Sequence, residues 1–168
     1  LRRFLNYCEV LDKLMSDLQI NKTVPSLVLD GTNGSITIPS DVKGKKLIIY
    51  FYPKDSTPGC TNEGVAFTEA YSQFKDLNVE IYGVSRDSIK SHENFKKKYN
   101  FPFNLLSDPD ELACNLFNVI KMKNMYGKEV RGIERSTFLI NEKGELIKEW
   151  RAVKVNDHIQ QILEFLKN

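Results

Sequence analysis

The sequence has no long hydrophobic run, and no stretch of it approaches the roughly 20 consecutive apolar residues that cross a bilayer. The opening residues alternate charged with apolar side chains, unlike a signal peptide with its continuous apolar centre. Cysteine is also scarce: Cys8, Cys60 and Cys114 are an odd number at wide spacing, which argues against a secreted disulfide framework. We therefore expect a soluble, intracellular protein in a reducing compartment, in the cytoplasm or nucleus rather than an organelle, and not secreted.

Residues that bind metals, nucleotides or nucleic acids are also few. Histidine occurs only as His92 and His158, and no CxxC or HxxxH spacing is present, so we expect no metal site. No glycine-rich nucleotide fingerprint occurs, and no cofactor is expected. The formal net charge is +2 with both signs interspersed, so nucleic-acid binding is not expected. We interpret His92 as an exposed helix residue; a Cys-His hydrolase built on Cys60 and His92 is the alternative.

Apolar patterns predict one α/β domain in this chain of 168 residues. Residues 47–52 are apolar throughout, which is typical of a central strand covered on both faces. A helix separates this strand from the strand at 79–84, so the two strands should pair in parallel. Asp108 is predicted to cap a short helix, with Pro109 at its first position and Cys114 within it. Further strands are expected near 27–29, 35–38, 136–140 and 146–150, and helices at 61–74, 88–99 and 155–166.

Residues 1–22 are predicted to form a helical extension that precedes the main domain, residues 23–168. Its apolar residues recur at intervals of three and four, as in an amphipathic helix that packs on the domain or on a partner chain. Cys8 lies on the apolar side, where a core cysteine is expected.

Cys60 follows the segment Pro53-Lys54-Asp55-Ser56-Thr57-Pro58-Gly59, between the apolar strand and a predicted helix. The free N–H groups and positive dipole of a helix N-terminus favour a thiolate, which is a nucleophile. Most free cysteines are instead buried structural residues. A structural cysteine would need neither the Pro-Gly turn nor the hydroxyl of Thr57, so we interpret Cys60 as reactive.

Pro53, Thr57 and Cys60 fill the pattern PxxxTxxC, and the strings FYPKDSTPGCT, GVSRDS, SHENF, LLSDPD, MYGK and IERSTFLI follow in order along the chain. Together they resemble the peroxiredoxins, in particular the bacterioferritin comigratory protein or Q-type branch, from about Thr23 to the C-terminus. This resemblance implies a thioredoxin-like sandwich with a central mixed sheet flanked by helices.

The same resemblance implies a thiol-dependent peroxidase that reduces hydrogen peroxide and small alkyl hydroperoxides through a Cys60 sulfenic acid. Thr57 would orient the peroxide, Pro53 would shield the pocket, and Arg135, just before a late strand, would stabilise the thiolate and the transition state. Without the resemblance, Arg135 would be interpreted as a surface ion-pair residue. Glu63 matches a position that carries an acid or amide in this branch, and we expect it to act indirectly at most.

The chain departs from the branch at the resolving cysteine, because the two usual places correspond to Val65 and to about Lys96. We therefore favour a one-cysteine mechanism with thioredoxin, glutaredoxin or glutathione as reductant, in a monomer or weak homodimer. Resolution by Cys114 or Cys8 is the alternative. A redox-regulated peroxide sensor or holdase-type binding protein is the rival function, and a disulfide reductase is less favoured because Cys60 has no CxxC partner.

Overall fold

The computed structural model describes residues 18–168. The predicted N-terminal helix and Cys8 therefore lie outside the described residues, and the division at residue 22 stays a prediction. Residues 18–22 form no helix. No helix in the described part is long and apolar enough to cross a membrane.

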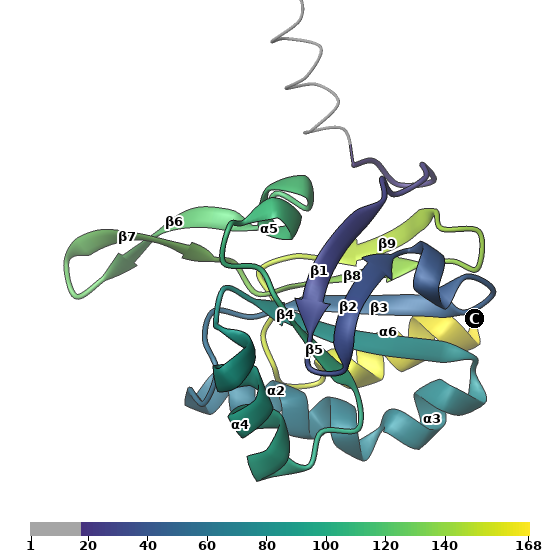
Figure 1. Cartoon of the computed structure of the whole chain (residues 1–168), viewed down its shortest axis with the longest axis horizontal. Helices are drawn as coiled ribbons and strands as arrows, with labels where there is room; N and C mark the ends of the chain where they lie inside the picture. Colours follow the sequence, from purple (N-terminus) through teal and green to yellow (C-terminus); the bar gives the residue numbers. More distant parts are fainter. Residues whose placement is uncertain (1–17) are drawn as a thin grey trace, which may run out of the picture.

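A seven-stranded mixed sheet organises the fold, with the strand order β2-β1-β5-β4-β3-β8-β9 (Figure 1). Its strands are β1 (Leu27–Gly31), β2 (Gly34–Ile38), β3 (Lys46–Phe51), β4 (Val79–Ser85), β5 (Asn104–Ser107), β8 (Ser136–Ile140) and β9 (Leu146–Trp150). The helices are the 3-10 helix η1 (Ser40–Val42) and the α-helices α2 (Pro58–Glu69), α3 (Tyr71–Asp76), α4 (Ile89–Tyr99), α5 (Leu112–Leu116) and α6 (His158–Lys167). The predicted α/β class, central mixed sheet and flanking helices are confirmed.

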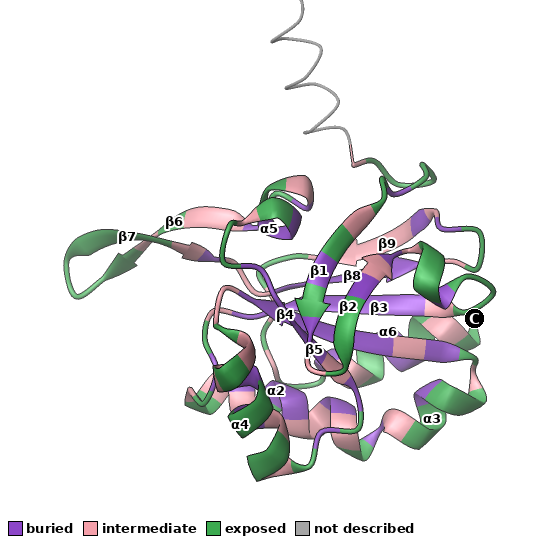
Figure 2. Ribbon diagram, in the orientation of Figure 1, coloured by how far each residue is buried: buried purple, intermediate pink, exposed green. Residues whose placement is uncertain are grey.

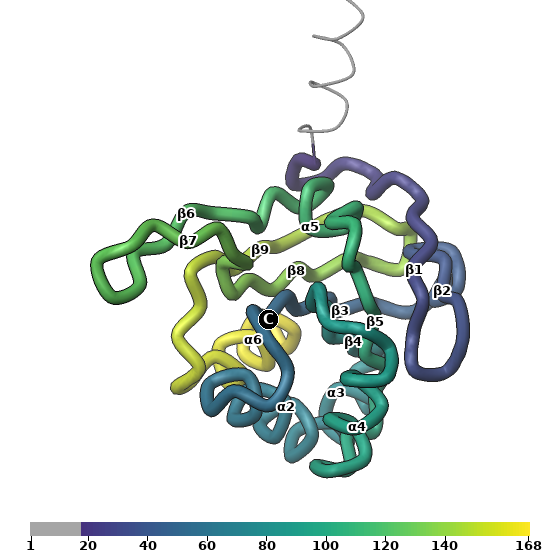
Figure 3. The backbone as a smooth tube through the Cα atoms, turned by 60° about the vertical axis from the view of Figure 1, so that its left-hand side comes forward, coloured from purple at the N-terminus to yellow at the C-terminus, as the bar shows by residue number. Residues whose placement is uncertain are grey.

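Strand β3 lies inside the sheet, parallel to β4 and antiparallel to β8. Its alternate side chains enter different cores: Ile49 and Phe51 join one hydrophobic cluster, and Ile48 and Tyr50 join the other. Helices α2, α3, α4 and α6 cover the second of these faces, as Figures 1 and 3 both show. Burial on two faces explains why this strand is apolar throughout, and Figure 2 shows the buried colour concentrated on the inner strands.

The register of β3 and β8 brings distant residues together at the end of the sheet where the loop toward Cys60 leaves β3. Phe51, the last residue of β3, pairs with Val84 on one side and with Ser136 on the other. The loop that follows β3 therefore begins beside the residue that precedes Ser136, which is Arg135. This register, rather than any local pattern, places Arg135 next to the segment that carries Cys60.

Two predicted helices have different bounds in the structure. The expected helix at 61–74 is two helices, because α2 begins at Pro58 and the chain breaks at Ala70 before α3. The expected cap at Asp108 is wrong: α5 begins at Leu112, and Glu111, with a φ of 60°, occupies the cap position. The Asp108 carboxylate instead accepts a hydrogen bond from the backbone N–H of Cys114 at 2.8 Å. Asp108 thus binds a free N–H of the first turn without occupying the cap position itself.

The sequence patterns did not predict the two-stranded ribbon of β6 (Ile120–Met125) and β7 (Lys128–Ile133). The ribbon extends away from the body of the protein (Figure 1). Its strands mix lysine with methionine and bury almost nothing, so they lack the apolar signal on which strand prediction depends. Tyr126, at the turn between them, is fully exposed.

Candidate active site

The Cys60 thiol lies in the first turn of α2 and is only 2% exposed. Thr57 is the N-cap residue and Pro58 occupies the first helical position, where the missing N–H of proline costs no helix bond. The first bond of the helix runs from the Thr61 N–H to the Thr57 carbonyl at 2.9 Å. The backbone N–H groups of Gly59 and Cys60 therefore lie ahead of the helix ladder, where they favour an anion. The predicted position of Cys60 at a helix N-terminus is confirmed.

Arg135 is 75 residues away from Cys60 in the sequence, but its Nη2 lies 3.5 Å from the Cys60 Sγ. Gly59 makes this approach possible, because a Cβ at that position would lie 3.0 Å from Nη2. The glycine of the Pro-Gly turn thus leaves room for the guanidinium. The charged group faces the thiol directly.

Glu63 holds the other side of the same guanidinium, since Arg135 Nη1 donates to Glu63 Oε1 at 2.7 Å. The carboxyl group is 1% exposed. Burial raises the pKa of Glu63 to about 7, although the nearby Arg135 charge lowers it. Its second oxygen, Oε2, has no hydrogen-bond partner in the described part of the chain. Glu63 therefore contacts Arg135, which in turn faces the Cys60 sulfur.

Burial and the two neighbouring groups, Glu63 and Cys60, shift the pKa of Arg135 in opposite directions. Burial lowers the Arg135 pKa, but the Glu63 carboxylate and the Cys60 thiolate raise it by more, so the net shift is upward. The guanidinium thus keeps its charge in a largely enclosed place. It can stabilise negative charge on the Cys60 sulfur and on an oxygen next to it.

Thr57 and Pro53 lie in the loop that joins β3 to α2. The Thr57 Oγ1 donates to the Lys54 carbonyl at 2.8 Å. Because a hydroxyl has one hydrogen and two acceptor positions, the oxygen is left free to accept from a bound O–H group. Pro53 is half-buried where the chain leaves the sheet. The catalytic roles of Thr57 and Pro53 stay predictions.

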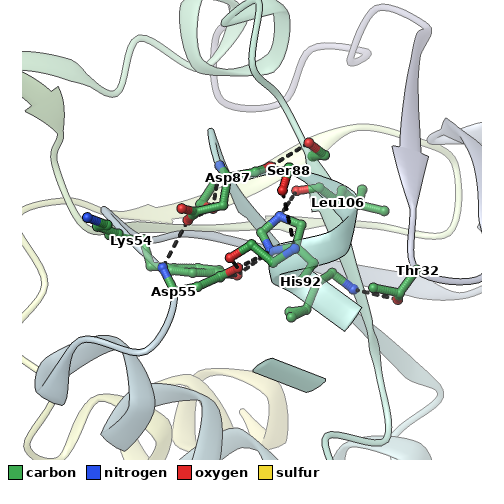
Figure 4. A network of polar contacts seen from close by, with 12 residues as sticks. Thr32, Lys54, Asp55, Asp87, Ser88, His92 and Leu106 are labelled. Atoms are coloured by element: carbon green, nitrogen blue, oxygen red, sulfur yellow. Dashed lines mark hydrogen bonds and ion pairs between the residues drawn. The ribbon is translucent and has the colours of Figure 1, made fainter. Parts of the chain in front are cut away.

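His92 lies in the interior, and the expectation of an exposed residue is wrong. Its side chain has no exposed area; Nδ1 is 2.7 Å from Asp55 Oδ2 and Nε2 is 2.9 Å from the Leu106 carbonyl (Figure 4). With both ring nitrogens engaged there, His92 is not placed to deprotonate Cys60. The signal that could have shown this is helical spacing, because His92 precedes the buried Phe95 by three residues on the same face of α4.

Cys114 is buried in α5 with no exposed area, as predicted. Burial raises the pKa of its thiol far above the usual value, and the Asp108 charge adds to this. Cys114 belongs to the hydrophobic cluster on one face of the sheet, whereas Cys60 belongs to the cluster on the other. Both are free thiols. The sheet thus lies between the two cysteines.

Comparison with known proteins decides the family of this chain. Residues 20–149 match the AhpC/TSA family. The chain belongs to that family. Its relatives are peroxiredoxins: the Bacillus subtilis peroxiredoxin Bcp is 48% identical over 151 residues, which cover 90% of this chain and 96% of that protein.

The match extends to structure. The Xanthomonas campestris bacterioferritin comigratory protein is 51% identical, with a TM-score of 0.79, over 84% of this chain and 90% of that one. The peroxiredoxin described here therefore has the thioredoxin-like fold of the Bcp or Q-type branch, and it is a thiol peroxidase. The resemblance to this branch that the motifs indicated is confirmed.

Proposed function

We propose that this peroxiredoxin reduces hydrogen peroxide and small alkyl hydroperoxides through Cys60 alone, with an external thiol as reductant. The observation that carries this proposal is the Arg135 Nη2 at 3.5 Å from the Cys60 Sγ, at the start of a helix. The Xanthomonas relative is described by its alkyl peroxide reduction activity. A thiolate faced by a cation and by free backbone N–H groups suits attack on a neutral O–O bond, which releases an oxyanion.

The reaction balances in three steps. The Cys60 sulfur attacks one peroxide oxygen, an S–O bond forms as the O–O bond breaks, and the leaving oxygen takes a proton to become an alcohol or water. The sulfur is oxidised to a sulfenic acid. An external thiol attacks that sulfur, releases water and forms a mixed disulfide, which a second thiol reduces to return Cys60 and an external disulfide.

The neighbouring residues would have separate roles in the first step. Arg135 would hold the thiolate and the developing charge on the leaving oxygen. Thr57, whose hydrogen is donated to the Lys54 carbonyl, would accept the peroxide hydrogen and so orient the O–O bond. Pro53, at the exit of the strand, would keep water from the sulfur.

The one-cysteine form of the mechanism is supported by what surrounds Cys60. By the resemblance to the branch, the usual resolving cysteines correspond to Val65 and to about Lys96, and Cys114 lies in the cluster on the opposite face of the sheet. The Xanthomonas relative, by contrast, carries at least two cysteines, because structures of two variants each replace a different cysteine by serine. A disulfide requires Cα atoms within about 7 Å, which the intervening sheet disfavours for Cys114. Thioredoxin, glutaredoxin or glutathione would supply the electrons.

Intact mass measured after one equivalent of peroxide, with and without dimedone, tests the mechanism. Wild-type protein should carry one dimedone adduct on Cys60, Cys60→Ser should carry none, and Cys114→Ser should behave like wild type. A cross-linked peptide pair of Cys60 and Cys114, two hydrogens lighter, would show that Cys114 resolves the sulfenic acid. Steady-state turnover with each of the three reductants distinguishes an enzyme from a sensor that is oxidised only once.

Replacing Arg135 by lysine tests the transition-state contact. Lysine keeps the charge but has a single ammonium, which cannot reach Glu63 and Cys60 together as the two guanidinium nitrogens do. The peroxide reaction should slow by about 10²–10³-fold, the usual effect of one lost preorganised donor. Arg151→Lys is the matched control, because Arg151 binds the carbonyls of Phe117 and Asn118 instead. Equal rates in both variants would remove Arg135 from the mechanism.

A further inference from the structure

A polar network lies behind the loop that leads from β3 to Cys60, and its centre is Asp55 (Figure 4). The Asp55 side chain is 3% exposed. Its Oδ1 accepts from the Tyr52 hydroxyl at 2.7 Å, and its Oδ2 accepts from the Ser91 hydroxyl at 2.8 Å. The His92 Nδ1 lies 2.7 Å from the same Oδ2. One carboxyl group thus joins the loop to two residues of α4.

The hydrogen bonds of this pair follow from its partners. His92 Nε2 faces the Leu106 carbonyl, which can only accept, so this nitrogen carries a hydrogen. On the other side of the ring, Nδ1 faces the Asp55 carboxyl group, which also accepts the hydroxyl hydrogens of Tyr52 and Ser91. Removing either member of the pair would leave a buried polar atom of the other without its partner.

The backbone of the loop has a second attachment at the end of β4. The Asp55 N–H donates to Asp87 Oδ2 at 2.9 Å, and the same oxygen accepts from the Ser85 hydroxyl at 2.6 Å. Asp55 is therefore held through both its side chain and its main chain. It lies two residues before Thr57 and five before Cys60.

The same residues have the composition of a cation site, since ligand atoms of Asp55, Asp87 and His92 lie within 4.8 Å of one another. The geometry favours hydrogen bonding instead. A separation of 2.7 Å between Nδ1 and the Asp55 carboxylate leaves no room for an ion between them, and Asp87 Oδ2 already accepts from the Asp55 N–H and the Ser85 hydroxyl.

We propose that His92 and Asp55 are positioning residues for the peroxidase, which hold the loop before Cys60 closed and determine how often the start of α2 opens. The closed loop aligns Thr57 and Cys60 for attack on peroxide. The open loop exposes the Cys60 sulfur, which is 2% accessible when closed, to the external thiol. This inference rests on the proposed role of Cys60. It predicts that more frequent opening of the loop slows the reaction with peroxide and accelerates reduction of the sulfenic acid by the external thiol.

His92→Phe tests this role, because phenylalanine keeps a ring but donates to neither Asp55 nor Leu106. Hydrogen exchange of backbone amides in residues 53–62 should accelerate roughly 10- to 100-fold, the factor for leaving a buried hydrogen-bonding group without its partner. Stopped-flow reaction with peroxide should slow, and reduction of the preformed sulfenic acid by glutathione should accelerate. Leu47→Ala, at the far end of β3 in the other cluster, is the control for lost stability alone.

Two further variants keep the test informative if His92→Phe does not fold. Tyr52→Phe removes one hydroxyl that donates to Asp55. Like His92→Phe, but to a smaller extent, it should slow the peroxide reaction and accelerate reduction of the sulfenic acid. Asp55→Asn should retain most loop protection, because its amide can still form a hydrogen bond with the His92 ring and its carbonyl can accept from Tyr52. A purely structural effect would follow the melting temperature in all variants.

Equal loop exchange in His92→Phe and Leu47→Ala, measured at matched global stability, would overturn the positioning role. Zn²⁺ or Mn²⁺ that raised the melting temperature of wild type but not of His92→Phe would overturn it in favour of a cation site. Hydrogen exchange is measured without peroxide, so it tests the role of His92 and Asp55 in the loop independently of catalysis. Turnover retained in Cys60→Ser would refute the proposed function but would leave an observed increase in loop exchange valid.

Discussion

Glu63 offers a pH test of the active site that does not depend on catalysis. The structure buries this carboxyl group beside Arg135 and raises its pKa from 4.5 to about 7. Glutamine has nearly the same shape, keeps an oxygen that can accept from Arg135, and does not ionise. Glu63→Gln therefore removes one buried titration while leaving the packing in place.

The magnitude follows from the pKa. A tenfold change in proton affinity is worth about 1.4 kcal/mol, so an increase from 4.5 to about 7 costs the folded protein about 3 kcal/mol once Glu63 ionises. Because folding raises this pKa, the neutral acid is favoured in the folded state. The contribution of Glu63 to stability is complete below pH 4.5 and is lost as the pH rises to about 7. Glu63→Gln should match wild type near pH 4.5 and exceed its stability by about 3 kcal/mol at pH 8.

Urea denaturation at intervals between pH 4.5 and 8, followed by circular dichroism, measures this difference. Both proteins should carry Cys60→Ser, so that titration of the nearby thiol does not contribute. A difference that stays constant with pH would show that the pKa of Glu63 is the same in the folded and unfolded states. A difference that grew toward acid would show that the Arg135 charge outweighs burial and that the direction argued here is wrong.

Three further substitutions test the loop and helix α2. Thr57→Val should slow the peroxide reaction by about 10²–10³-fold. It should cost only about 1 kcal/mol of stability, because the hydroxyl makes no cap bond to the helix and only an exposed hydrogen bond to the Lys54 carbonyl; an unchanged stopped-flow rate would show that the hydroxyl is not needed. Val65→Cys should allow a reducible disulfide with Cys60 once the first turns of the helix open, and mass spectrometry should then find less sulfinic acid after excess peroxide than in wild type; equal amounts would contradict this. Gly64→Ala should destabilise the protein by about 1–3 kcal/mol, because its Cβ would lie 2.5 Å from the Phe101 ring; an unchanged melting temperature would show that the ring has room to move.

The sequence by itself determined the features that depend on neighbouring residues. The position of Cys60 just after a Pro-Gly turn, between an apolar strand and a helix-compatible segment, predicted a thiol at a helix start from neighbouring residues alone. The unbroken apolar run at 47–52 predicted a central strand, and the short segments at 27–29, 35–38, 136–140 and 146–150 predicted strands that the structure pairs as two antiparallel hairpins. The motif around Cys60 was sufficient for the family.

Only the tertiary structure decided which distant groups meet. Arg135 faces Cys60 because β8 pairs with β3 in a particular register, and no pattern within either segment specifies that register. The contacts of Glu63 and His92 also depend on elements far away in sequence, because no local pattern specifies that Glu63 meets Arg135 or that His92 meets Asp55. The ribbon of β6 and β7 buries too little apolar area to leave a pattern. Periodicity shows that a side chain is covered, whereas the packing of the whole chain determines which group covers it.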